Sequence, residues 1–211
     1  MKQHSLLLII LLAAQVCIAQ PTIVKNDATQ VLYIGANNPV TVRVDHYKPA
    51  ELTVKVSTGN IYKTTVPGKY NWTICENNDS LAKIKIYCGK QFIKEVSFLL
   101  LKLPDAVLTI GHSNCRAPVN LKMEKGIRAR IENHILGDGV ICKVINFKVT
   151  VTSKDKLVTA GNDGAFFTPE VFKILNDCRP GSTVVFEKIL YQVGCEPMFR
   201  EFSSGIAFNI F

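Results

Sequence analysis

The 211-residue chain carries 25 Lys and Arg against 17 Asp and Glu, a formal charge of +8. This length suits one large domain or two small ones. The basic residues are spread through strand-like segments and form no arginine cluster with interleaved aromatics, which argues against nucleic-acid binding.

Residues 1–19 predict a signal peptide. A positively charged start is followed by an apolar core at residues 6–14, and Cys17-Ile18-Ala19 offers a cleavage site that would leave Gln20 as the first mature residue. The apolar run is too short to span a membrane, and no later segment suits a transmembrane helix. The alternative is a lipoprotein acylated on Cys17, although the polar Gln15 fits a lipobox badly. We therefore expect an exported protein. Its location is either the periplasm, or the cell surface or medium.

Residues 20–103 predict a first β-sandwich domain of the immunoglobulin-like type. Apolar and polar residues alternate in three runs, and a period of two indicates strands with one face in a core. These runs are 40–44, 52–56 and 83–87, and turn residues lie between the strands at 37–39, 58–60, 67–68, 77–79 and 89–90. Short strands at this spacing, without long helices, are typical of a sandwich. Lysines that alternate with isoleucines at 83–86 predict a solvated sheet face and protection of a sheet edge.

Residues 104–211 predict a second β-sandwich domain with one short α-helix. Its expected strands are 106–110, 127–131, 140–152, 183–191 and 206–211. The helix should begin after Thr168, a good N-cap followed by Pro169, and end near Cys178 before a proline and a glycine. Phe167 and Phe172 are placed to form a hydrophobic staple. The fold class is therefore mainly β, with two small sandwich domains in tandem.

Six segments carry a resemblance to a known family. Residues 31–40 read Val-Leu-Tyr-Ile-Gly-Ala-Asn-Asn-Pro-Val, and the later stretches are 103–107, 147–150, 167–170, 179–189 and 204–210. Taken in this order, they resemble the C-terminal domains of the GldM/PorM family, the periplasmic shaft of the gliding-motility and type IX secretion machinery of Bacteroidetes. Residues 31–40 are similar to the opening of an immunoglobulin-like domain in that family. The resemblance covers nearly all of the mature chain.

The chain also departs from the family. In the family, a transmembrane helix and a helical domain precede the sandwich domains, whereas we expect a cleavable signal here, followed at once by the first sandwich. The resemblance therefore implies docking on an envelope partner, such as a secretion-machinery component, and not the transmission of motor force. A homodimer stays open, as does the alternative of a secreted effector or adhesin that binds a host or cell-surface target.

Catalytic chemistry is not expected from this sequence. The chain has no nucleophile elbow, P-loop or dinucleotide fingerprint. His112 and Cys115 could share a metal with His134 or Cys142, but paired close spacings such as two CxxC units are missing. We therefore expect a protein that is not an enzyme and has no metal or other cofactor.

Six cysteines follow the signal peptide, and an even count in an exported protein suggests disulfides. If residues 77–80 form a turn, Cys75 and Cys88 lie roughly 20 Å apart along the strands, which is too far for a bond. A pair in the second domain, such as Cys178–Cys195, is the candidate disulfide. Isolated buried thiols are the alternative.

The candidate partner-binding residues are Met198 and Phe199. They belong to the segment 194–204, which is more apolar than a solvated turn requires, and an exposed apolar patch can mark an interface. We expect this segment at the free end of the second domain, with packing onto its own domain as the alternative. Trp72 and the pair Phe166-Phe167 could also anchor a partner, but core packing is the favoured interpretation for them.

Overall fold

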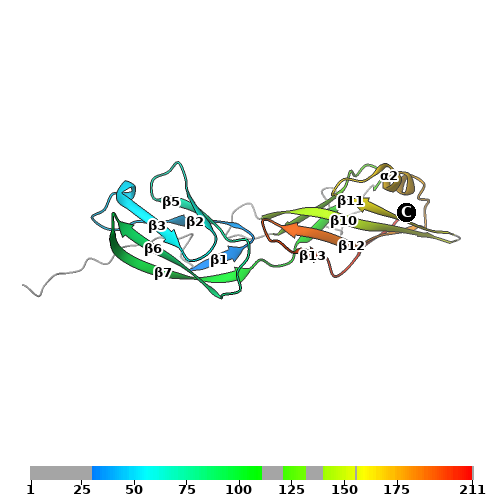
Figure 1. Cartoon of the computed structure of the whole chain (residues 1–211). Helices are drawn as coiled ribbons and strands as arrows, with labels where there is room; N and C mark the ends of the chain where they lie inside the picture. The colour runs from blue at the N-terminus through cyan, green and yellow to red at the C-terminus, as the bar shows by residue number, and fades with distance from the viewer. Residues whose placement is uncertain (1–29, 111–120, 132–139, 155, 211) are drawn as a thin grey trace, which may run out of the picture.

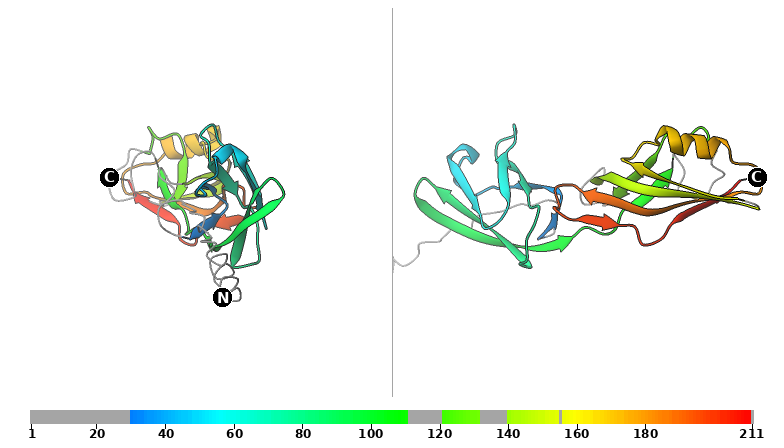
Figure 2. Two further views of the ribbon diagram at one scale, coloured as in Figure 1. Left: turned by 90° about the vertical axis from the view of Figure 1, so that its left-hand side faces the viewer. Right: turned by 45° about the vertical axis from the view of Figure 1, so that its right-hand side comes forward.

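The computed structural model describes residues 30–110, 121–131, 140–154 and 156–210. Figures 1 and 2 show this part of the chain as two β-rich halves joined end to end, with the N-terminal half in blue to green and the C-terminal half in green to red. The described chain is mainly β, with sandwich-like packing and one α-helix, as the sequence predicts.

The described strands of the first half form two sheets. A four-stranded sheet has the order β1-β7-β6-β3, and a three-stranded sheet has the order β2-β5-β4. The strands are β1 (Val31–Ile34), β2 (Asn37–Thr41), β3 (Leu52–Val56), β4 (Asn60–Lys63), β5 (Lys69–Thr73), β6 (Leu81–Cys88) and β7 (Gln91–Lys102), with a 3-10 turn η2 (Pro49–Glu51) before β3. All pairings are antiparallel except β1 with β7, which is parallel.

The predicted alternation of β6 is confirmed, but its predicted edge position is wrong. Ile84 and Ile86 are fully buried, while Lys83 and Lys85 face solvent. However, β6 is hydrogen-bonded to β3 on one side and to β7 on the other, so it lies inside the sheet. The sequence interpretation missed this because β7 shows no regular alternation over much of its length.

The chain reverses before the predicted Asn-Asn-Pro turn. Gly35 adopts a φ of +85°, a left-handed conformation that favours glycine, and β2 already begins at Asn37. Asn38 is buried: its Oδ1 accepts a hydrogen bond from the Tyr33 N–H (2.8 Å), and its Nδ2 donates to the Trp72 carbonyl (3.1 Å). These bonds join Asn38 of β2 to β1 and β5, which is why it belongs to a strand and not to a turn.

The described strands of the second half form one seven-stranded sheet, in which two strands lie off the main path. Its main order is β13-β12-β10-β9-β8, and β11 pairs with β10 while β14 pairs with β12. The strands are β8 (Val107–Ile110), β9 (Ile127–Ile131), β10 (Val140–Ser153), β11 (Lys156–Asp163), β12 (Thr183–Val193), β13 (Phe199–Glu201) and β14 (Ile206–Asn209). The sequence predicts five of these strands and misses β11 and β13.

Helix α2 (Pro169–Asn176) forms where the sequence predicts it. Thr168 Oγ1 accepts a hydrogen bond from the Val171 N–H, and the rings of Phe167 and Phe172 meet edge to face with centroids 5.7 Å apart. Val171 and Leu175 bury their side chains on the face that packs toward the sheet. The cap, the staple and the apolar face thus all agree with the sequence.

Two hydrophobic cores lie on either side of residues 101–102. The first is built around the fully buried Trp72, whose ring packs against Phe98 and whose Nε1 donates to the Thr58 carbonyl (2.9 Å). The second takes its other buried residues from 103–206, and Ala36 is its one buried residue among the described residues 30–102. The domain boundary at 103/104 stays a prediction. No helix in the described ranges is long and apolar enough to cross a membrane.

Candidate protein-binding surface at the disulfide-bonded junction

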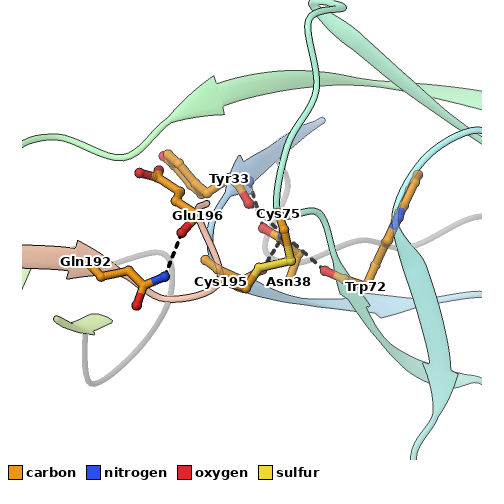
Figure 3. The surroundings of a disulfide bond; sticks show 8 residues. Tyr33, Asn38, Trp72, Cys75, Gln192, Cys195 and Glu196 are labelled. Atoms are coloured by element: carbon orange, nitrogen blue, oxygen red, sulfur yellow. Dashed lines mark hydrogen bonds between the residues drawn. A yellow bond between two sulfur atoms is a disulfide. The ribbon is translucent and has the colours of Figure 1, made fainter. Parts of the chain in front are cut away.

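Met198 and Phe199 are both exposed, with 76% and 54% of their surfaces accessible to solvent. β12 ends at Val193, the chain turns, and β13 begins at Phe199. The predicted position of this segment at the free end of the second half is wrong, because the turn between β12 and β13 contacts the first half (Figures 1 and 3). The two candidate residues therefore lie near the junction of the halves.

A disulfide between Cys75 and Cys195 joins the two halves (Figure 3). The two Cα atoms lie 5.0 Å apart, and 120 residues separate the cysteines in sequence. The predicted Cys178–Cys195 pair is therefore wrong: Cys178 is a buried free thiol that donates a hydrogen bond to the Ile174 carbonyl (3.3 Å). The expectation that Cys75 and Cys88 are not bonded is confirmed.

Two glycines allow the turns to meet beside this disulfide. The Cys195 N–H donates to the Gly35 carbonyl (3.3 Å), and Gly35 in turn donates its N–H to the Ile74 carbonyl (2.8 Å). A Cβ on Gly194 would collide with the Gly35 carbonyl oxygen, and the φ of Gly194 is +47°. Only glycine fits this position without displacing the facing turn.

Arg200, the residue after Phe199, holds the linker between the halves. Its Nη1 donates to the carbonyls of Leu103 (2.8 Å) and Pro104 (3.0 Å), while Nε and Nη2 form a bidentate pair with the Glu196 carboxylate at 3.0 and 2.7 Å. The Arg200 side chain is only 18% exposed. Burial alone would lower the pKa of Arg200, but the hydrogen bonds and charge of Glu196 outweigh burial and raise it. The Arg200 guanidinium therefore stays charged while it holds the Glu196 carboxylate and the two linker carbonyls.

Tyr191, the cross-strand partner of Arg200, also holds the linker. Its hydroxyl accepts a hydrogen bond from the Ala106 N–H (3.2 Å) and donates to Asp105 Oδ1 (3.3 Å), and the ring is fully buried. Burial raises the pKa of Tyr191, so the hydroxyl keeps its proton over the whole physiological range. The disulfide, Arg200 and Tyr191 thus connect the turn before β13 and β13 itself to the linker and the first half.

No group of three or more His, Cys, Asp and Glu residues that could hold a metal occurs in the described ranges. Burial raises the pKa of the Cys142 thiol to about 11, which keeps it protonated and unreactive near neutral pH. His112, Cys115 and His134, the other members of the considered metal set, lie outside the described residues.

The aromatic candidates divide between core and surface. Trp72 is fully buried and Phe167 is 5% exposed, so core packing is confirmed for both. Phe166 is 77% exposed, on the segment that leads into α2. The favoured core packing is therefore wrong for Phe166. Trp72 and Phe167 are removed from the set of binding candidates, and Phe166, Met198 and Phe199 remain in it.

The fold defines a mainly β protein whose two halves are joined by a disulfide. No protein-family model and no curated protein sequence matches the chain. Among solved structures, the chain is similar to the Yersinia pseudotuberculosis adhesin InvE at 13% identity and a TM-score of 0.28. The match covers 92% of this chain and 60% of the length of that chain.

Proposed function

We propose that this protein is an exported, non-catalytic module that binds a protein partner in the cell envelope. The signal-like start and the resemblance of its segments, in order, to the periplasmic tip of the GldM/PorM shaft support this proposal. A disulfide across the two halves also suits an exported protein, because disulfides form and persist in oxidising compartments. A secretion-machinery component is the expected kind of partner.

The observation that carries the proposal is the exposure of Met198 and Phe199 on a rigid support. The preceding turn is bonded to the first half through Cys195, and the next residue, Arg200, is held by Glu196 and the linker. A segment whose backbone is held in place before binding loses little backbone freedom when a partner covers it. Phe and Met are enriched in protein interfaces relative to the rest of the surface.

The experiment is a crosslinking pull-down from intact cells with the wild type and a Met198→Asp, Phe199→Asp double variant. Leu157→Asp is the matched control, because Leu157 is 69% exposed but lies on β11, beside the β10–β11 turn. We expect the wild type and the control to capture the same partner and the double variant to lose at least tenfold of it. Equal capture by a folded double variant would reject this surface, and no specific capture by the wild type would reject the binding function.

Cell fractionation separates the proposal from the secreted effector or adhesin. Retention in the periplasm together with a secretion-machinery component supports the envelope module. Release of the intact, disulfide-bonded protein into the medium, with binding to host or neighbouring cells, supports the alternative.

A further inference from the structure

The outer face of the sheet β1-β7-β6-β3 carries a row of leucines. Leu81 of β6 pairs directly with Leu99 of β7, and Leu101 follows two residues later on the same face. Alternation sends Phe98 and Leu100 into the core, and the three leucines to solvent. They keep 48%, 42% and 39% of their surfaces exposed, respectively. Three neighbouring leucines form a continuous apolar surface, unlike the single exposed residues that are normal on any protein.

The row leads to the junction described above. β1 lies beside β7 in parallel register, with Tyr33 opposite Leu101, and Tyr33 packs against the core of the second half. Two residues after Leu101, the Leu103 carbonyl accepts the hydrogen bond from Arg200, the neighbour of Phe199. Figures 1 and 2 show the end of β7 and strand β13 on the same side of the molecule.

The remainder of this face is basic. Lys83 and Lys85 follow Leu81 on β6, and Lys55 lies opposite Lys85 on β3. Glu95 is the acidic residue of this face, and it pairs with Lys83 at 3.1 Å and with Lys85 at 3.5 Å. The hydrogen bond from Lys83 in particular lowers the pKa of Glu95. Three lysines against one carboxylate leave the face with a positive charge, as the whole chain has.

We propose that this outer face docks a protein partner that presents an apolar strip flanked by Asp and Glu carboxylates. The proposal rests on the proposed function and names the chemistry of the partner. The leucine row would be covered by the strip, and the lysines would attract and orient its carboxylates, because charge complementarity sets association rate and register. The leucines belong to the hydrogen-bonded strands β6 and β7 and do not protrude from a loop, which favours a protein surface over insertion into a lipid bilayer.

The first part of the test is a photo-crosslinking amino acid at position 99 of the full-length protein, used in intact cells. Mass spectrometry identifies the crosslinked peptide. The proposal expects a peptide of another protein in which apolar residues are flanked by Asp or Glu. A crosslink to residues 20–29 of the same chain, to a second copy, or to a peptide without acidic residues would overturn it.

The second part measures the affinity of the purified partner for charge variants. Lys83→Glu, Lys85→Glu should weaken binding at least tenfold at low salt, and the difference should shrink as salt rises. The control is Lys156→Glu, Lys173→Glu, on β11 and α2 of the second half, which should leave the affinity unchanged. Equal affinity of both double variants overturns the proposal, as does wild-type flotation with phosphatidylglycerol vesicles when no partner is captured.

The two proposals fail in different ways. If the pull-down depends on Met198 and Phe199 but no partner crosslinks from position 99, the outer face is not the docking surface and the binding function stands. If neither approach captures another protein, both proposals are wrong.

Discussion

Removal of the Cys75–Cys195 disulfide is the perturbation with the clearest expected size. The double variant Cys75→Ser, Cys195→Ser keeps the turn contact between Gly35 and residue 195 and the Arg200 clamp, and deletes only the covalent link. Cys88→Ser is the matched control, since Cys88 is a partly exposed free thiol outside the junction.

The size of the effect follows from the length of the closed loop. The disulfide joins residues 120 positions apart. Chain entropy for a loop of this length gives about 4.9 kcal/mol at 25 °C, and natural disulfides typically contribute about 2–4 kcal/mol. For a chain of this size, such a loss lowers the melting temperature by roughly 5–15 °C.

Differential scanning calorimetry of the mature protein measures this loss, with and without reductant. The wild type in reductant and the double variant should melt at the same, lower temperature, while the control should follow the wild type. Small-angle scattering should also show a broader distribution of interatomic distances for the double variant, because the halves are then held by non-covalent contacts and the linker alone. Identical melting of the double variant and the wild type would refute the interpretation of this bond as the covalent tie of the junction.

Further predictions concern the cores and the junction. Trp72→Ala should destabilise the first half by about 3–5 kcal/mol in urea unfolding, because it empties the centre of a core. Gly194→Ala should lower stability by at least about 1 kcal/mol, since the new methyl group strikes the facing carbonyl. Iodoacetamide at pH 8 should label Cys88 in the native protein but leave the buried Cys142, whose pKa is about 11, until urea is added. The isolated segment 104–211 with Cys195→Ser should fold cooperatively by circular dichroism, and an unfolded fragment would reject the predicted boundary.

Local patterns in the sequence were sufficient for much of the fold. The alternation at 52–56 and 83–87 identified buried strand faces, and Thr168 with Pro169 identified the start of the helix. These features depend on residues that are close together in the chain. β13 was missed because it is only three residues long and depends on pairing with β12.

The candidate site was less accessible from the sequence, because it depends on contacts between distant segments. Nothing local to Cys75 or Cys195 indicates that the two turns meet, or that Arg200 reaches the linker. The exposure of Leu81 was readable, because it shares the parity of the solvent-facing Lys83 and Lys85. That signal becomes meaningful only when β7 is known to lie beside β6 and to place a second leucine opposite the first.

The central claim, that the protein binds a partner through its junction, is tested most directly by a photo-crosslinking amino acid at position 198 in intact cells. The account predicts a discrete, ultraviolet-dependent adduct with one envelope protein from position 198 and none from position 157, which is similarly exposed on β11 of the second half. Equal adducts from both positions, or no adduct from position 198 in a folded and exported protein, would contradict the claim.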